Sequence, residues 1–189
     1  MRRSHMVGVL LLGAFLPGCC CCMALGGEDE GASVQALEAD TPRTTVPEAL
    51  SGEWRDPQQF NSAARSIDLF DPGRGEWLGD PDAQAGTGMR FTSDGQYVWG
   101  TYVTVGTGGC RTRALKYQQG TVAVEGASLT LHPSVHRQKY EGGCSNNVDS
   151  DTEQPLTPLS GTWATGVSED GRQVLQLGVD GSNLTFVRP

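Results

Sequence analysis

The sequence is poor in basic residues: 14 lysines and arginines stand against 22 acidic residues, which gives a formal charge of −8. An acidic surface repels phosphate, so this composition argues against binding of nucleic acid by bulk electrostatics. The runs of alanine, leucine, glutamate and lysine that a helical protein needs are also missing. Aromatic residues make up only 7 %, whereas the 26 glycines, many in Asp-Gly and Gly-Gly pairs, predict short strands joined by turns.

The familiar catalytic and metal-binding motifs are missing as well. The chain has no Gly-x-Ser-x-Gly elbow, no phosphate-binding loop and no convincing triad. His132 and His136 have the spacing of two ligands on a helix, but Pro133 and the surrounding strand pattern argue against a helix there. We therefore expect no enzyme, no metal site and no cofactor. Only a glycosidase-like pair of carboxylates stays open, because sequence alone cannot pair them.

No apolar run reaches the about twenty residues that cross a membrane as a helix. The longest near the start, Met6–Leu16, follows Arg2 and Arg3. A basic segment followed by an apolar one of about eleven residues is typical of an export signal peptide. We expect residues 1–18 to form that signal peptide.

The four residues that end this segment, Leu16-Pro17-Gly18-Cys19, resemble the bacterial lipobox. In that motif the cysteine becomes the mature N-terminus and its thiol accepts a diacylglyceryl group. The resemblance implies lipidation of Cys19 and a membrane anchor in the bacterial cell envelope. Several acyl chains would hold the protein there permanently, because each buried methylene contributes about 0.8 kcal/mol.

Cys19 begins a run of four cysteines that ends at Cys22. Metal sites usually space their thiolates as Cys-x2-Cys so that two turn onto one ion, and adjacent cysteines do not fit that pattern. Plain secretion without a lipid and a palmitoylated cluster stay open as alternatives. Cys20, Cys21 and Cys22 have no assigned role, although Cys20 instead of Asp after the lipidated residue favours the outer membrane in a bacterium with two membranes.

Residues 19–50 contain almost no bulky apolar side chains. From Met23 onward this segment has six acidic residues and a single base, Arg43. A segment of this composition cannot offset the conformational entropy lost on ordering. We therefore expect residues 19–50 to be a disordered tether that carries a folded domain at 51–189.

Residues 51–189 alternate between strand-like segments and turns. In the segment 96–105, QYVWGTYVTV, Tyr97, Trp99 and the following odd-numbered residues share one face of a strand, and an Asp-Gly turn precedes it. Similar segments occur at 121–124, 128–131, 173–177 and 183–187. Sequential hairpins produce an antiparallel meander, and closure into a barrel buries one face and removes the free edges. The predicted fold class is therefore all-β, as an antiparallel up-and-down β-barrel.

Both ends of this domain resemble lipocalin-type barrels. The segment LSGEW that ends at Trp54 is similar to the Gly-x-Trp opening of that family, and the last strand with Arg188 is similar to its closing strand. In the family, the tryptophan plugs the closed end of the barrel and the arginine stacks over it, a cation-π contact. The resemblance implies that Trp54 and Arg188 are this pair. The segment LSGTW that ends at Trp163 repeats the pattern, which other small envelope domains such as the META type also have, so the topology stays open.

Cys110 and Cys144 are the cysteines outside the N-terminal run, and each follows two glycines. Paired glycines let the backbone reach disulfide geometry without strain. One well-separated pair in an exported chain favours a disulfide. We predict a Cys110–Cys144 bond, which closes a loop of about 35 residues and contributes roughly 3 to 4 kcal/mol in the chain-entropy model.

Two functions are consistent with such a barrel. A hollow barrel would bind a small apolar ligand, whereas a filled one would act as an interaction or structural module of the cell envelope, with an unknown protein partner. In the second case the loop from Phe60 to Leu78 is a candidate exposed apolar patch. Six residues are candidates for the wall of a cavity and equally for a packed core: Phe91, Tyr97, Trp99, Leu175, Leu177 and Phe186.

Overall fold

The computed structural model describes residues 40–58, 67, 70–71, 74, 76–77, 85–107, 110–142 and 149–189. The predicted signal peptide, Cys19 and Cys144 lie outside the described residues, as does the side chain of Cys110. The lipid attachment and the disulfide therefore stay predictions. Within the described part, no segment forms a helix with the length and apolar character that a membrane crossing needs.

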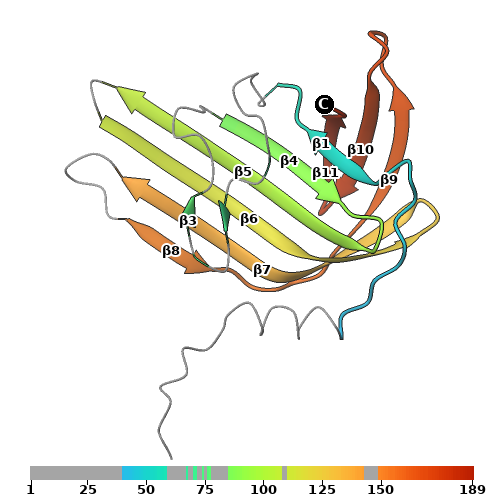
Figure 1. The fold of residues 1–189 in the computed structure, drawn as a ribbon, viewed down its shortest axis with the longest axis horizontal. Helices are drawn as coiled ribbons and strands as arrows, with labels where there is room; N and C mark the ends of the chain where they lie inside the picture. The colour runs from blue at the N-terminus through green and yellow to red at the C-terminus, as the bar shows by residue number, and fades with distance from the viewer. Residues whose placement is uncertain are drawn as a thin grey trace, which may run out of the picture.

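Eight antiparallel strands form a closed up-and-down barrel, which confirms the predicted fold class (Figure 1). Each strand pairs with the next along the chain, and the last pairs with the first to complete the circle. The strands are β1 (Gly52–Arg55), β4 (Ala85–Phe91), β5 (Gln96–Thr107), β6 (Cys110–Glu125), β7 (Ser128–Gly142), β9 (Leu159–Val167), β10 (Gln173–Val179) and β11 (Ser182–Val187). Outside the circle, β2 (Phe70–Asp71) pairs with β3 (Glu76–Trp77), and β8 (Ser150–Glu153) pairs with β7.

Tight turns with glycine connect the strands where the sequence predicts them. At the β10–β11 hairpin, Asp180 and Gly181 both have positive φ, 50° and 71°. A two-residue turn of this kind matches the right-handed twist of the flanking strands, and Asp-Gly is one of the pairs that tolerate it. The local sequence therefore determines both the turn and the register of this hairpin.

The barrel has a packed end and an open end. Alternate residues of the strands point inward, and near the β4–β5, β6–β7 and β9–β10 turns they form one apolar cluster. We call this the closed end; its fully buried members include Trp54, Met89, Phe91, Tyr97, Val122, Leu131, Leu175, Leu177 and Phe186. The opposite end, where the β5–β6 and β10–β11 turns lie, is the open end.

The chain before β1 seals the closed end. Leu50 is fully buried and Val46 is 3 % exposed, both within the apolar cluster. The residues between them turn back on themselves, since the amides of Leu50 and Ser51 both donate to the Pro47 carbonyl at 2.9 Å. Residues 46–50, which we predicted from composition to be part of the tether, therefore belong with the barrel. Two apolar side chains hardly change the composition of a polar segment, so composition does not reveal them.

Residues 42–44, which precede the segment that seals the closed end, cover a strand edge. Strand β6 runs past its last partner in β5, which leaves the edge of Val122–Val124 without a neighbouring strand. Thr44 fills the position: its amide donates to the Val122 carbonyl at 3.1 Å, and its hydroxyl accepts from the Val124 amide at 2.8 Å. Pairing of this edge removes a site for association with other chains.

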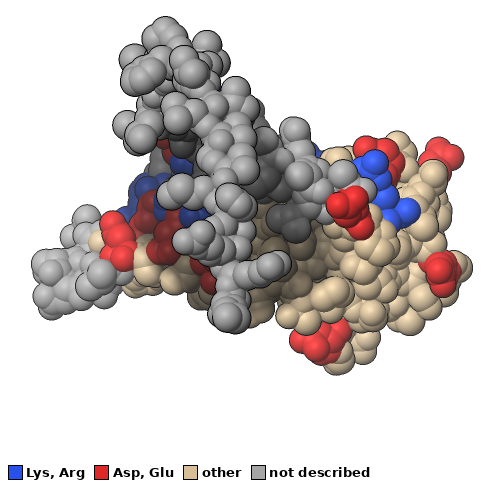
Figure 2. Space-filling model, turned by 90° about the horizontal axis from the view of Figure 1, so that it is seen from below, with Lys and Arg blue, Asp and Glu red and all other residues tan. Residues whose placement is uncertain are grey.

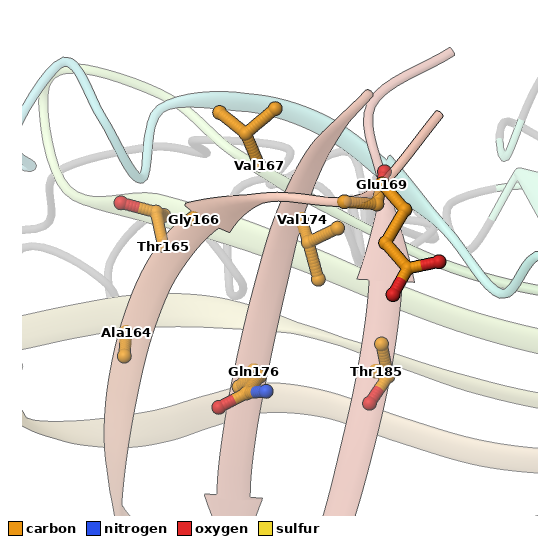
Figure 3. Close-up of a pocket in the computed structure, with 9 residues that line it drawn as sticks. Ala164, Thr165, Gly166, Val167, Glu169, Val174, Gln176 and Thr185 are labelled. Carbon is orange, nitrogen blue, oxygen red and sulfur yellow. The ribbon is translucent and has the colours of Figure 1, made fainter. Parts of the chain in front are cut away.

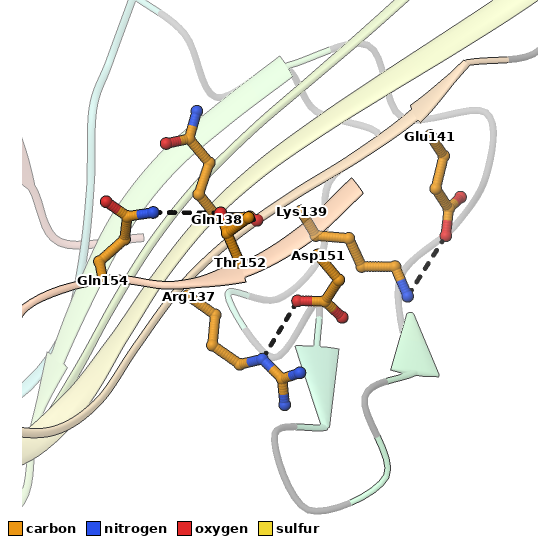
Figure 4. Close-up of polar contacts among 7 residues, drawn as sticks. All are labelled: Arg137, Gln138, Lys139, Glu141, Asp151, Thr152 and Gln154. Atoms are coloured by element: carbon orange, nitrogen blue, oxygen red, sulfur yellow. Dashed lines mark hydrogen bonds and ion pairs between the residues drawn. The ribbon is translucent and has the colours of Figure 1, made fainter. Parts of the chain in front are cut away.

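Strands β5 to β7 are long, with 12, 16 and 15 residues, and with β8 they extend beyond the shorter strands at the open end (Figure 1). Opposite charges pair on this extension, two pairs across neighbouring strands and one, Lys139–Glu141, within β7. The pairs are Arg113–Glu141 at 2.9 Å, Lys139–Glu141 at 3.5 Å and Arg137–Asp151 at 3.2 Å; the last two are drawn in Figure 4. The two cross-strand pairs, Arg113–Glu141 and Arg137–Asp151, favour this register of the ladder.

Replacing Leu50 with alanine tests whether residues 46–50 are part of the folded unit. The change leaves a cavity in the closed end, and we expect the free energy of unfolding in urea to fall by about 2 to 5 kcal/mol. Leu156→Ala is the matched control, because Leu156 is 45 % exposed and should change stability by less than about 0.5 kcal/mol. Equal effects of the two variants would show that the seal contributes nothing.

Candidate functional site

Trp54 and Arg188 lie together at the closed end. The Arg188 guanidinium carbon is 4.6 Å from the centroid of the Trp54 ring, and the ring is fully buried. The Trp54 indole N–H donates to the Leu50 carbonyl at 2.7 Å, and Arg188 Nη2 donates to the Ser51 carbonyl at 2.8 Å. The tryptophan, the arginine and the chain before β1 thus form one plug. Trp163 is different: it is half-buried and donates to the Gly126 carbonyl at 3.0 Å.

A β-bulge in β7 redirects the strand between the two ends. Gln119 pairs with Val135 and Gly120 with Pro133, so Ser134 is an extra residue on β7. Proline fits here because a bulge requires no ladder donor. Gly120 is required opposite it, since a Cβ on Gly120 would lie 2.0 Å from the His132 carbonyl oxygen.

The bulge also places His132 and His136 on opposite faces of the sheet. Four residues apart in a regular strand, they would share a face. Instead His136 pairs with Gln118 and faces inward, and its Nδ1 lies 3.1 Å from the Pro155 carbonyl oxygen. His132 pairs with Thr121 on the outer face, where partial burial lowers its pKa because desolvation disfavours the charged ring. The two histidines are therefore not placed as ligands of one ion.

A cavity of about 540 Å³ opens from the inside of the barrel at the open end. We call it the cup. It lies between the apolar cluster of the closed end and the solvent, and six of the eight barrel strands contribute to its wall. The lining residues are Asp56, Thr87, Trp99, Thr101, Lys116, Tyr117, Gln118, His136, Leu159, Asp180 and Leu184.

The wall of the cup combines an apolar surface with polar side chains. Trp99, Leu159 and Leu184 are partly buried and pack against the core cluster, so they offer apolar contact to a guest. The hydroxyls of Thr87 and Thr101 bond to one another at 3.1 Å. Two aspartates, one lysine and one histidine add charge or titratable groups, with Lys116 and Asp180 exposed to solvent. Such a wall suits a molecule with an apolar body and a polar group.

The six candidate wall residues divide between the core and the cup. Trp99 lines the cup. The other five are at most 1 % exposed, lie in the apolar cluster of the closed end and fill the barrel there: Phe91, Tyr97, Leu175, Leu177 and Phe186. Pattern alone places all six inside the barrel but does not show how far the packing extends along its axis. Gln118, Lys116 and His136 also line the cup, and no sequence motif marks Gln118 or Lys116.

A second, shallower groove of about 450 Å³ lies on the outer face of β9, β10 and β11 (Figure 3). Val167 is 72 % exposed beside it, and Val174 forms part of its floor. The remaining lining side chains are short or polar, among them Gln176, Thr185 and Glu169. On the face seen in Figure 2, the described surface is largely uncharged, with scattered acidic side chains and few basic ones.

Comparison of the chain with models of known protein families, with curated proteins and with solved structures finds no match. We therefore infer the function from the geometry of the site. Among the described residues, no group of three or more His, Cys, Asp or Glu side chains is placed to hold a metal ion.

Replacing Arg188 with methionine tests the plug. The variant keeps most of the side-chain volume but loses the cation-π contact and the bonds to the backbone carbonyls, so we expect a loss of about 1 to 3 kcal/mol in the free energy of unfolding. Arg172→Met is the control, since Arg172 pairs with exposed Asp170 on a turn and is itself 52 % exposed. A stable Arg188→Met protein would contradict a plug that depends on the guanidinium.

Proposed function

We propose that this protein binds a small molecule in the cup. One observation carries the proposal: the barrel is filled at the closed end and hollow at the open end, with a cavity of about 540 Å³. Ligand sites in proteins are typically concave and about 300 to 1,000 Å³ in volume, with mostly apolar walls and a few polar groups. The resemblance of the chain ends to lipocalin-type barrels supports the same function, since the plug at Trp54 leaves the other end open.

Binding without chemical conversion is the simplest function for this site. The cup contains no nucleophile next to a general base in the described residues: His136 lies beside the Pro155 carbonyl, and the two threonine hydroxyls bond to each other. Catalysis by a serine-type or cysteine-type mechanism requires a nucleophile and a base within hydrogen-bonding reach. We propose a binding protein, with an apolar portion of the ligand against Trp99, Leu159 and Leu184.

We further propose that the barrel is exported and held at the bacterial cell envelope by a lipid on Cys19. The support is the apolar segment and the lipobox-like sequence that ends at Cys19. A binding domain on a tether of this kind would take up its ligand at the membrane surface. The outer membrane is the proposed site, because Cys20 follows the lipidated residue.

The outer groove supports a second candidate function, as a docking site in an envelope assembly. Val167 is an apolar side chain that is 72 % exposed. Its neighbours in β9 are small or polar, so it does not extend into an apolar patch there. Single exposed valines are common on protein surfaces, and only contiguous apolar patches indicate an interface. We therefore propose the cup, rather than the outer groove, as the functional site.

Two variants that add the same bulk in different places test where a ligand binds. Thr101→Trp fills the cup, whereas Thr185→Trp fills the outer groove and leaves the cup open. With an environment-sensitive fluorophore as the probe, we expect Thr101→Trp to weaken binding at least about tenfold, since a filled cavity excludes the guest. We expect Thr185→Trp to bind as the unmodified protein does. The reverse result would assign binding to the outer groove.

Replacing Cys19 with serine tests the anchor. The variant loses the thiol that accepts the lipid, so we expect the protein to move from the membrane fraction to the soluble fraction, and the N-terminal peptide to lack acyl mass. Cys22→Ser is the control and should stay with the membranes. Retention of the Cys19→Ser protein in the membrane fraction would contradict the proposed attachment site.

A further inference from the structure

Gln118 is a buried polar side chain in the wall of the cup. It is 7 % exposed, and its Oε1 atom is buried without a hydrogen-bond partner in the described part of the chain. Buried polar side-chain atoms in native proteins nearly always have a partner, because an unmade bond costs the desolvation of the group. An unpartnered Oε1 atom on a side chain that lines a cavity therefore indicates a hydrogen-bond donor that the ligand supplies.

The strand pairing explains why Gln118 faces the cup. Gln118 lies between Trp99 of β5 and His136 of β7 in one cross-strand row. All three residues line the cavity. Beyond Trp99 the row continues to fully buried Met89 and Trp54, so it runs from the plug to the wall of the cup. A ligand that packs its apolar part on the Trp99 ring thus has its polar group next to the carboxamide of Gln118.

We propose that the ligand is a neutral amphiphile whose N–H or O–H group donates a hydrogen bond to Gln118. This inference depends on the proposed function of the cup and names the ligand class. The carboxamide has an acceptor oxygen and a donor nitrogen, so it pairs best with a group that also offers both, such as an amide or a hydroxyl. Two neutral partners of this kind satisfy each other without the burial of a charge.

The charges around the cup also disfavour an anionic head group. Asp56 and Asp180 contribute two negative charges to the wall, and Lys116 contributes one positive charge from an exposed position. An ionised carboxylate has no hydrogen to donate to Gln118 Oε1, and it would also lose its hydration, which costs more for an ion than for a neutral group. Ligands that are fatty-acid-like should therefore bind more weakly than the corresponding amides or alcohols.

Three probes with the same alkyl chain test this inference: decanamide, decanol and decanoate, measured by displacement of the fluorophore at about pH 7.5, where a carboxyl group is ionised. We expect decanamide and decanol to bind the unmodified protein about tenfold or more tightly than decanoate. Gln118→Leu replaces the carboxamide by an apolar group of similar size, and should weaken decanamide binding about tenfold while leaving the affinity for an uncharged alkane probe unchanged.

Gln176→Leu is the matched control, because Gln176 lies on the outer face of β10 and lines the outer groove rather than the cup. It should leave all affinities unchanged. Gln118→Met is a second, unbranched replacement in case Gln118→Leu does not fold, as judged by near-ultraviolet circular dichroism, and should give the same loss.

Two results would overturn the proposal in different ways. If the probes bind with equal affinity, or decanoate binds best, and the Gln118 variants have no effect, then the cup binds ligands but Gln118 does not select them. If no probe binds the unmodified protein, both the ligand class and the proposed function are wrong.

Discussion

The stacking of Arg188 on Trp54 determines how the interior of this barrel is used. The pair joins the last strand to the first at the point where the sheet closes, and the guanidinium ties both to the carbonyls of the chain before β1. The attraction between a cation and an aromatic ring is stronger where water is excluded. Because this contact and Leu50 fill one end of the barrel, the interior has a floor, and the other end is free to remain hollow.

The cup follows from this floor and from two irregularities in the strands. The bulge at Ser134 turns His136 inward, and Pro155 accompanies a break between β8 and β9, which otherwise lie end to end along β7. A regular β7 strand would place His136 on the outer face and Val135 on the inner face. The open end therefore has a wall of mixed polarity, in contrast to the uniformly apolar closed end.

Sequence pattern predicts the class of this fold well and its cavity poorly. Alternation in QYVWGTYVTV and the Asp-Gly turns suffice for the strands and hairpins, because side-chain direction in a strand has a period of two. A bulge breaks that period, so alternation along the sequence does not predict which face of the sheet His136 occupies. The position of Gln118 in the cup follows from its pairing with Trp99 and His136 across the sheet. The position of Leu50 in the core follows from its packing in the apolar cluster.

The indole N–H signals of the four tryptophans offer the most direct test of a barrel with a sealed end and an open cup. In a two-dimensional NMR titration with decanol, with signals assigned from Trp→Phe variants, Trp99 reports on the cup and Trp54 reports on the plug. The account predicts that the Trp99 signal shifts in a saturable manner while the Trp54 signal stays in place. A Trp99 signal that does not respond, or a shift that is largest at Trp54, would contradict it.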